Sequence, residues 1–328
     1  MHQLDKIDRK ILHELDLNAR LPLSQLAKRL GLSRDVANYR MKKLEKEKVI
    51  RGYRAFIDAS RLGYRMYRVC LKFYAISNKD YIELTDMLAS QENVFWVGQT
   101  DGFIDIVFGA WFRTASEFND FYASIIEKFR PVIKQDYVHE LLSYSYLDRA
   151  HLIDSKAFQR SEIIVGGNRE EAIDGKDIEI LRMLSTNART PLIGIANNLR
   201  MDSASIIYRI RNLESKGVVA GYKVDLSLKE LYRSFYSIKM YLSRFGRRRE
   251  LIAYLKSKPI VVNFTRAIGS WDVEFDVEVE NDGEYHSFIQ DVKDRFDFIS
   301  EISFFRVTKN LKVTNLPRIT PQDNHCKA

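Results

Sequence analysis

The chain has 328 residues, of which 45% are hydrophobic, and carries a formal net charge of +8 with a pI of about 9.2. This length suits two to four domains, and the basic balance permits nucleic-acid binding without proving it. No apolar run approaches the ~18 residues of a transmembrane helix, and residues 1–5 lack an apolar signal core, so no membrane partner is expected. Two distant cysteines argue against a disulfide framework and for a cytoplasmic protein. Six scattered histidines show no metal-ligand spacing, so neither a metal nor a cofactor is expected.

The first sixty residues predict three helices and a short strand. Apolar side chains recur at helical spacing after Asp5, whose carboxylate suits an N-cap. Two further helices within residues 23–48 flank a tight turn, in which Gly31 suits the left-handed position and Ser33 the next N-cap. This is the pattern of a helix-turn-helix, whose second helix enters the major groove of DNA. Residues 49–56 have the composition of a strand and are expected to form a wing.

The next ninety residues predict alternating strands and helices. Charged and apolar side chains alternate from Arg68 to Phe73, as in a half-buried antiparallel strand. A turn at Asp101-Gly102 separates the second strand from the third. The order strand-helix-strand-strand-helix-strand is that of the ferredoxin-like split βαβ fold. Strands are expected over residues 66–76, 94–100, 104–111 and 132–147, and helices over 80–90 and 116–129.

The second half of the chain repeats the first. Sliding the sequence by 169 residues aligns 4–53 with 173–222 without a gap and with 19 identities, and the later part repeats at an offset of 167. The chain is therefore predicted to be a tandem duplication. Its fold class is α+β, with two helix-turn-helix (winged-helix-like) domains alternating with two ferredoxin-like βαββαβ domains. The predicted boundaries are 1–60, 61–150, 171–229 and 230–316 for the domains, 151–170 for a linker and 317–328 for a polar tail.

Several short motifs occur in both copies. They include Asn18-Ala19-Arg20 with Asn187-Ala188-Arg189, and Val49-Ile50-Arg51-Gly52-Tyr53 with Val218-Val219-Ala220-Gly221-Tyr222. Together with the opening stretch 4–12, these residues resemble the Lrp/AsnC (feast/famine) transcriptional regulators over nearly the whole chain. Members of that family usually carry one unit, so the fusion of two is a departure. The resemblance implies binding of double-stranded DNA, sensing of an amino acid or related small molecule, and self-association through the ferredoxin-like sheets.

The resemblance also places an effector site between paired ferredoxin-like domains, near a Gly-x-x-Asp turn. That turn matches Gly102-Phe103-Ile104-Asp105 and Gly269-Ser270-Trp271-Asp272. A carboxylate there can hold an α-amino group, and backbone N–H groups can hold a carboxylate. For any single residue the favoured alternative is a hairpin turn whose aspartate caps backbone donors. The candidate effector-binding residues are Thr100, Asp101, Gly102, Asp105, Arg266, Gly269 and Asp272.

The two predicted recognition helices differ in what they present to DNA. Asn38 can pair with adenine and Arg34 with guanine, whereas Ile207 in the second copy offers only apolar contact. Arg200 replaces the turn glycine of the first copy, and Asp202 replaces its N-cap serine. The candidate DNA-binding residues are Ser33, Arg34, Asp35, Asn38, Tyr39, Arg40, Lys42 and Lys43 in the first copy, and Ser203, Ser205, Tyr208, Arg209 and Arg211 in the second.

Charge also separates the two copies. Residues 1–60 hold 14 Lys and Arg against 8 Asp and Glu, a net charge of +6, whereas residues 170–229 hold 9 against 8, a net charge of +1. Because phosphate contacts supply much of the affinity for DNA, the first copy is expected to bind DNA more tightly. The second copy is then a weaker half-site reader or one retained for assembly. Because the two predicted recognition helices differ, we expect the DNA site that they bind, the operator, to be asymmetric.

Other functions remain open at this point. Siroheme decarboxylases resemble Lrp/AsnC proteins and use histidines in the second strand region, but residues 94–100 and 262–266 contain none, which disfavours proton chemistry there. An architectural DNA-binding protein without an effector fits the basic charge, as does an interaction protein whose recognition helices are merely surface. No nucleophile–base pair or glycine-rich phosphate loop stands out, so no catalytic residue is expected and the chain is predicted not to be an enzyme.

Overall fold

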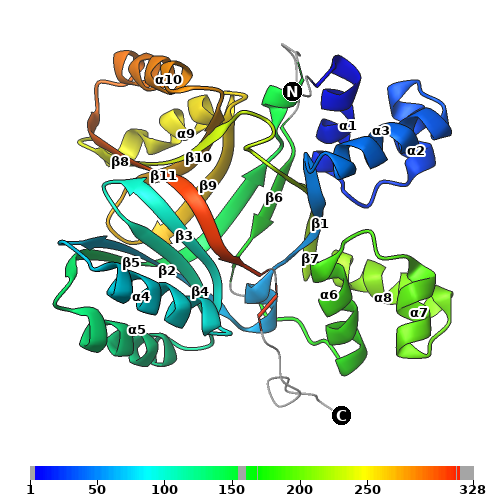
Figure 1. The fold of residues 1–328 in the computed structure, drawn as a ribbon, viewed down its shortest axis with the longest axis horizontal. Coiled ribbons are helices and arrows are strands. Elements are labelled where there is room, and N and C mark those ends of the chain that lie inside the picture. Colours follow the sequence, from blue (N-terminus) through cyan, green and yellow to red (C-terminus); the bar gives the residue numbers. More distant parts are fainter. Residues whose placement is uncertain (1–3, 154–159, 168, 315, 318–328) are drawn as a thin grey trace.

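The computed structural model describes residues 4–153, 160–167, 169–314 and 316–317. Two layers make up this part of the molecule (Figure 1). One layer holds two helix-turn-helix domains, and the other is a ring of strands with helices on its outside. The predicted α+β architecture and the tandem duplication are therefore confirmed. None of the described helices is long and apolar enough to cross a membrane.

The first helix-turn-helix domain comprises α1 (Lys6–Leu17), α2 (Leu23–Leu30) and α3 (Arg34–Lys46). Its helix ends have the predicted caps. The Asp5 carboxylate accepts hydrogen bonds from two backbone N–H groups of α1. Gly31 ends α2 in the left-handed conformation at φ +65°, and the Ser33 hydroxyl accepts from a backbone N–H of α3 at 3.2 Å. Because these contacts satisfy groups that helix ends leave open, local residues fix the turn between α2 and α3.

The second helix-turn-helix domain comprises α6 (Gly175–Thr186), α7 (Leu192–Leu199) and α8 (Ser203–Ser215). Asp174 and Asp202 cap α6 and α8 with their carboxylates. Arg200 takes the place of Gly31 and adopts φ +51°, a left-handed conformation that is uncommon for a residue with a side chain. The geometry of the turn is thus retained although its glycine is not.

An antiparallel ribbon of two strands, β1 (Ile50–Ile57) and β7 (Val219–Leu226), joins the two helix-turn-helix domains. The repeated Asn-Ala-Arg motifs meet beside it with two-fold symmetry. Arg20 donates to the Ala188 carbonyl at 2.5 Å, and Arg189 makes the reciprocal bond to Ala19 at 2.7 Å. Each guanidinium also lies over a tyrosine ring of the other copy. The apolar cores of the two domains are continuous, so the domains share one core.

Each ferredoxin-like unit has the predicted order of elements. The first unit comprises β2 (Arg65–Phe73), α4 (Asn78–Ser90), β3 (Val94–Gly102), β4 (Ile106–Phe112), α5 (Ala115–Phe129) and β5 (Ile133–Leu147). The second comprises β8 (Ser234–Leu242), α9 (Arg248–Lys256), β9 (Val261–Ile268), β10 (Val273–Val279), α10 (Asp282–Arg295) and β11 (Ile299–Val313). The strands lie in the orders β5-β2-β4-β3 and β11-β8-β10-β9, so the two sheets have the same topology.

The two sheets close on each other to form a ring. The edge strand β3 pairs antiparallel with β11, and β9 pairs with β5. β5 and β11 are each 15 residues long, so part of each strand stays in its own sheet and the rest joins the other sheet. Eight strands are thereby closed into a barrel whose members have no free edge between them. The two ferredoxin-like sheets of this chain therefore pair with each other.

The segment predicted as a linker contains regular structure. The single turn η2 (Ala150–Leu152) follows β5, and β6 (Glu162–Val165) pairs antiparallel with the end of β5 as a ninth strand. Two other single turns are η1 (Ala59–Leu62) and η3 (Phe245–Arg247). The predicted tail lies outside the described residues, except for Pro317.

Ionised side chains are buried inside the ring. Glu274 of β10 accepts hydrogen bonds from Arg68 of β2 and, at 3.0 Å, from Lys239 of β8. Burial disfavours the charged form of Glu274, but the two neighbouring cations outweigh it and lower its pKa to about 2. Asp276 of β10 likewise accepts from the Tyr144 hydroxyl of β5 at 2.6 Å. Arg68 and Tyr144 belong to the first unit and their acceptors to the second, so these bonds join unlike units.

Candidate nucleic-acid interface

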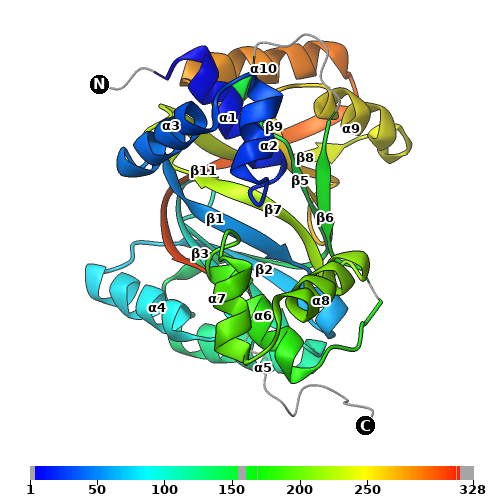
Figure 2. The same cartoon turned by 90° about the vertical axis from the view of Figure 1, so that its right-hand side faces the viewer.

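The outward face of α3 presents polar side chains to solvent. Figure 2 views the molecule from the side of the helix-turn-helix domains, with the β1–β7 ribbon between them. Ser33 lies where this face begins, at the N-terminus of the helix. The exposed residues are Arg34, Asp35, Tyr39 and Lys42, and Asn38 and Lys43 are half-buried beside them. The structure thus brings these predicted DNA contacts together on one helix.

Arg40 and Arg209 form ion pairs within their own domains, and their role as DNA contacts stays a prediction. Arg40 donates to Asp5 at 2.7 Å and to Asp8 at 2.8 Å. Arg209 makes the equivalent pair of bonds to two aspartates of the second copy. Because Asp8 is only 3% exposed, its ion pair is a buried contact between α1 and α3. These arginines bind the recognition helix to the N-terminal part of its domain, and the sequence analysis did not predict their acceptors.

α8 presents fewer charged groups than α3. Tyr208 and Arg211 are exposed, whereas Ser203 and Ser205 are half-buried. The Ser205 hydroxyl donates to the N-cap aspartate at 2.6 Å. Ile207, half-buried, stands at the position that Asn38 has in α3. The second recognition helix therefore offers one exposed cation, Arg211, among its predicted contacts.

The two Gly-x-x-Asp turns meet at one end of the ring. Their rings Phe103 and Trp271 pack edge to face, with centroids 5.7 Å apart. Asp105 accepts from the backbone N–H of Phe73 at 2.8 Å and pairs with Lys72 at 2.9 Å. Asp272 accepts from the backbone N–H of Leu242 at 2.7 Å. Both aspartates thus accept from a backbone N–H at the end of a neighbouring strand, β2 or β8, and not from a donor within their own turn.

The other predicted effector residues are dispersed around these turns. Thr100 is buried and donates to the Ile104 carbonyl at 2.9 Å. Asp101 is exposed and pairs with Arg306 of β11 at 3.3 Å. Arg266 is exposed. Gly102 and Gly269 lie against β11 and β5, where an added Cβ would collide with the neighbouring strand or its side chain. An effector at this end of the ring stays a prediction.

The repeated Asn-Ala-Arg and Gly-Tyr motifs have a structural role that sequence reasoning missed. Arg20, Arg189 and their tyrosine partners hold the two helix-turn-helix domains together. The signal was present, because these residues are identical in the two copies, whereas most exposed positions of the recognition helices differ. Identity between copies therefore indicated the contact between them, and divergence indicated the exposed surface.

Comparison with known proteins agrees with this geometry. The family model for winged helix-turn-helix DNA-binding domains matches residues 4–51 and 173–220. The regulatory protein AsnC of Haemophilus influenzae is 32% identical over 129 residues, which are 39% of this chain and 84% of AsnC. The chain belongs to the Lrp/AsnC family of transcriptional regulators.

Further relatives match shorter parts of the chain. The HTH-type transcriptional regulator FL11 of Pyrococcus abyssi is 33% identical over 120 residues, 36% of this chain and 77% of FL11. The leucine-responsive regulatory protein of Rhizobium meliloti is 46% identical over 69 residues, 21% of this chain and 44% of that protein. As an Lrp/AsnC protein with two winged helix-turn-helix domains, the chain is a DNA-binding transcriptional regulator.

A solved structure shares the whole two-unit arrangement. The siroheme decarboxylase NirDL superposes with a TM-score of 0.65, covering 97% of this chain and 96% of its own, at 13% identity. This likeness shows that the Lrp/AsnC chain studied here and NirDL have the same fold.

Proposed function

We propose that this regulator binds an asymmetric DNA site and that α3 is its main reading helix. The observation that carries the proposal is a difference between the two helix-turn-helix domains, called reading heads below, which the β1–β7 ribbon joins. α3 exposes Arg34, Asp35, Tyr39 and Lys42, whereas α8 exposes Tyr208 and Arg211 and has Ile207 in place of Asn38. A bidentate contact from Arg or Asn discriminates between bases by ~1–3 kcal/mol. At the positions of Arg34 and Asn38, the second head has Ser203 and Ile207 instead.

Charge supports the same assignment. The first head has a net charge of +6 over residues 1–60, against +1 over residues 170–229. Each phosphate contact adds roughly 0.9 to the slope of log affinity against log salt concentration. We therefore expect the first head to account for most of the salt dependence of binding.

We infer that both heads contact one duplex. The β1–β7 ribbon and the reciprocal arginine bonds hold the heads together within one chain. Two-fold readers contact half-sites about 34–36 Å apart. Because the sheets also pair within the chain, a single chain supplies what two separate units supply in a dimer.

Selection from a random double-stranded DNA pool, followed by binding at several salt concentrations, tests the proposal. We expect one enriched site whose halves differ. Lys42→Ala should then weaken binding more than Arg211→Ala, since these two residues occupy equivalent positions. A symmetric site with equal losses would contradict the asymmetric assignment. Salt-sensitive binding without any enrichment would indicate an architectural protein instead.

An amino-acid-like effector at the Gly-x-x-Asp turns and further association between chains are part of the proposal, supported by family membership. Titration of the DNA complex with free amino acids tests the first, and sedimentation of the free protein tests the second. No response to any amino acid would remove these turns from the regulatory mechanism. A single-chain species at all concentrations would restrict association to the two units of one chain.

A decarboxylase-like activity is the second candidate function, favoured by the whole-chain likeness to NirDL. Against it stand the residues of β3 and β9, which include no histidine to exchange protons near neutral pH. Incubation with siroheme and analysis of the products discriminate between the two. Loss of carboxylate groups at a rate above the protein-free control would overturn the non-enzyme assignment.

A further inference from the structure

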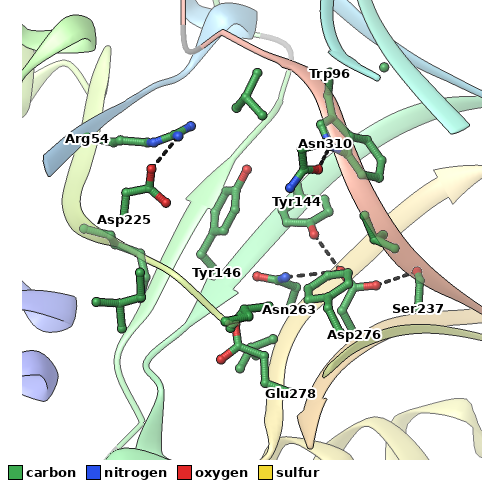
Figure 3. A pocket seen from close by; sticks show the side chains of 18 of the residues that line it. Arg54, Trp96, Tyr144, Tyr146, Asp225, Ser237, Asn263, Asp276, Glu278 and Asn310 are labelled. Carbon is green, nitrogen blue, oxygen red and sulfur yellow. Dashed lines mark hydrogen bonds and ion pairs between the residues drawn. The ribbon is translucent and has the colours of Figure 1, made fainter. Parts of the chain in front are cut away.

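A large cavity lies at the end of the ring that faces the β1–β7 ribbon. Its volume is about 900 Å³, near the upper limit of pockets that hold drug-sized molecules. Residues of all eight ring strands and of both ribbon strands line it (Figure 3). None of the described lining residues belongs to the Gly-x-x-Asp turns, which close the other end of the ring. The space is far larger than a free amino acid needs.

Aromatic side chains form much of the cavity wall. Tyr146 packs against Phe56 and Tyr144, with ring centroids 4.2 and 4.6 Å apart. Trp96 stands on the β3 side, where its indole N–H donates to Asn310 at 2.8 Å. Flat apolar faces of this kind suit a flat apolar ligand body.

Positive charge predominates around the cavity. Nine lysine and arginine residues line it, against three acidic residues. The acidic side chains already have partners: Asp276 accepts from Tyr144, Ser237 and Asn263, and Glu278 accepts from Arg149. Seven of the nine cations also pair with carboxylates, so the excess of positive charge is greatest where two cations share one carboxylate. The nine cations are Arg51, Arg54, Arg68, Arg149, Lys223, Lys229, Arg233, Arg306 and Lys309.

On the ribbon side of the cavity, arginine N–H donors outnumber the carboxylate oxygens that they bond to. Arg51 and Arg54 of β1 both bond to the single carboxylate of Asp225 in β7, at 2.7 and 2.6 Å. Two guanidinium groups thus share one negative charge, and each has five N–H donors. Because planar guanidinium groups match carboxylate, sulfonate and phosphate oxygens, this wall can bind an anionic ligand group without losing the pair to Asp225.

We propose that this cavity binds an amphipathic anion, a ligand with a flat apolar body and several acidic groups. The body lies among Phe56, Trp96, Tyr144 and Tyr146, and the acidic groups face Arg51 and Arg54. Such a ligand touches strands of both units and the ribbon that carries both reading heads. Resting on the proposed function, the cavity is then an effector site that changes how the heads sit on DNA.

A fluorescent trianion, 8-methoxypyrene-1,3,6-trisulfonate, is a direct probe of the cavity in the full chain without DNA. Binding should be saturable, should quench tryptophan emission, and should be at least tenfold tighter than that of neutral 1-pyrenemethanol. Arg54→Gln should weaken it by roughly tenfold, the typical effect of one hydrogen bond to a charged group. Trp96→Phe should reduce the quenching.

Matched controls distinguish the cavity from other basic surfaces. Arg244→Gln removes an exposed arginine–aspartate pair of the same 2.6 Å length outside the cavity, and it should leave probe binding unchanged. Binding that Lys42→Ala abolishes and Arg54→Gln does not would place the probe on the recognition helix and overturn the proposal. Equal binding of the trianion and the neutral pyrene would also overturn it.

The effect on DNA is measured separately. Saturating trisulfonate should shift the affinity for the selected site in the wild type by at least threefold and should not do so in Arg54→Gln. Cavity binding without such a shift would overturn the effector role. If the chain selects no DNA site, the proposed function fails, while the probe titration still decides whether the cavity binds amphipathic anions.

Discussion

At the scale of single residues, Arg40 can act in DNA binding, in the stability of its domain, or in both. Replacing Arg40 by Ala leaves the buried Asp8 without that cation. We expect a loss of about 1.5–3 kcal/mol in the free energy of unfolding, the usual contribution of a hydrogen bond between charged groups. Lys42→Ala, at an exposed position of the same helix, should change stability by less than about 0.5 kcal/mol and weaken DNA binding instead. Urea unfolding and DNA titration of both variants provide the comparison. Unchanged stability with lost DNA affinity in Arg40→Ala would place Arg40 in the DNA interface alone.

His139 is a second residue whose surroundings decide its behaviour. It is fully buried in the ring and stacks on Trp271 at 4.4 Å between centroids. Burial and the positive charges of Arg68 and Lys239 outweigh Glu274 and lower its pKa from 6.5 to about 4. The unfolded chain therefore takes up the proton first as the pH falls.

Stability should accordingly decrease as the pH falls from 6.5 toward 4. The contribution of His139 to this decrease amounts to up to about 3 kcal/mol. His139→Phe should remove it, so the variant should unfold at a urea concentration that varies less between pH 7 and pH 4. His286→Gln, at an exposed position of α10, is the control. An unaltered pH dependence in His139→Phe would show that other groups cause it.

The caps were predictable and the ion pairs were not. Asp5, Gly31 and Ser33 act on backbone groups within a few residues, so their residue types alone indicate their positions. The acceptors of Arg40 lie 32 and 35 residues away in the sequence. No local pattern relates residues at that separation, and only the packing of α1 against α3 brings them together.

At the scale of elements, the two strand pairs that close the ring, β3 with β11 and β5 with β9, depend on close approach of their backbones. Gly102 has φ +132°, and a Cβ there would lie 2.6 Å from the Phe304 carbonyl oxygen of β11. Gly167 has nearly the same φ, +133°, but a Cβ there would meet nothing within 4 Å. The two glycines therefore separate backbone strain from a clash between strands.

Gly167→Ala should cost about 1–2 kcal/mol of stability through its left-handed backbone alone. Gly102→Ala should cost a further 1–3 kcal/mol, roughly the penalty of overpacking, because β3 has to move away from β11. Urea unfolding of both variants, monitored by circular dichroism, measures the difference. Equal losses would mean that the β3–β11 strand pair tolerates an added methyl group.

The elements themselves were largely predictable, and their closure was not. Alternating and helical periodicities indicate the strands and helices of the first unit within a few residues, and the repeat indicates those of the second. Periodicity does not show that β5 and β11 each serve two sheets, because pairing depends on contacts between distant strands. For the same reason the sequence predicts a linker over residues 151–170, where the four-residue strand β6 lies.

At the scale of the whole molecule, duplication indicated two similar units, but the groups that join them are unlike. The ring interior places Arg68 against Glu274 across the units, and the cavity lies where the ring meets the ribbon. Neither follows from a repeat, since a repeat reports what the copies share. The contacts and the cavity between the units are therefore features that the repeat alone does not predict.

Arg149 connects the two layers of the molecule. It bonds to Asp16 of α1 at 2.6 Å and to Glu278 of β10 at 3.0 Å, and Lys223 of β7 also reaches Asp16 at 2.9 Å. Both carboxylates are buried. Burial works against their charged forms, but the cations outweigh it, together with His151 at Glu278, and lower the pKa of each carboxylate to about 2.

Arg149→Met should therefore destabilise the protein by about 3–5 kcal/mol at pH 7, since it removes the arginine from buried Glu278 and leaves buried Asp16 with Lys223 as its remaining cation. In the wild type, the contribution of Asp16 and Glu278 is complete above their unfolded pKa values of about 4 and is lost as the pH falls toward 2. The difference between variant and wild type should then shrink between pH 5 and pH 2. Urea unfolding at pH 7, 5 and 3 measures it, with Arg244→Gln as a surface-pair control. A difference that stays constant with pH would mean that Arg149 joins the layers by packing rather than by charge.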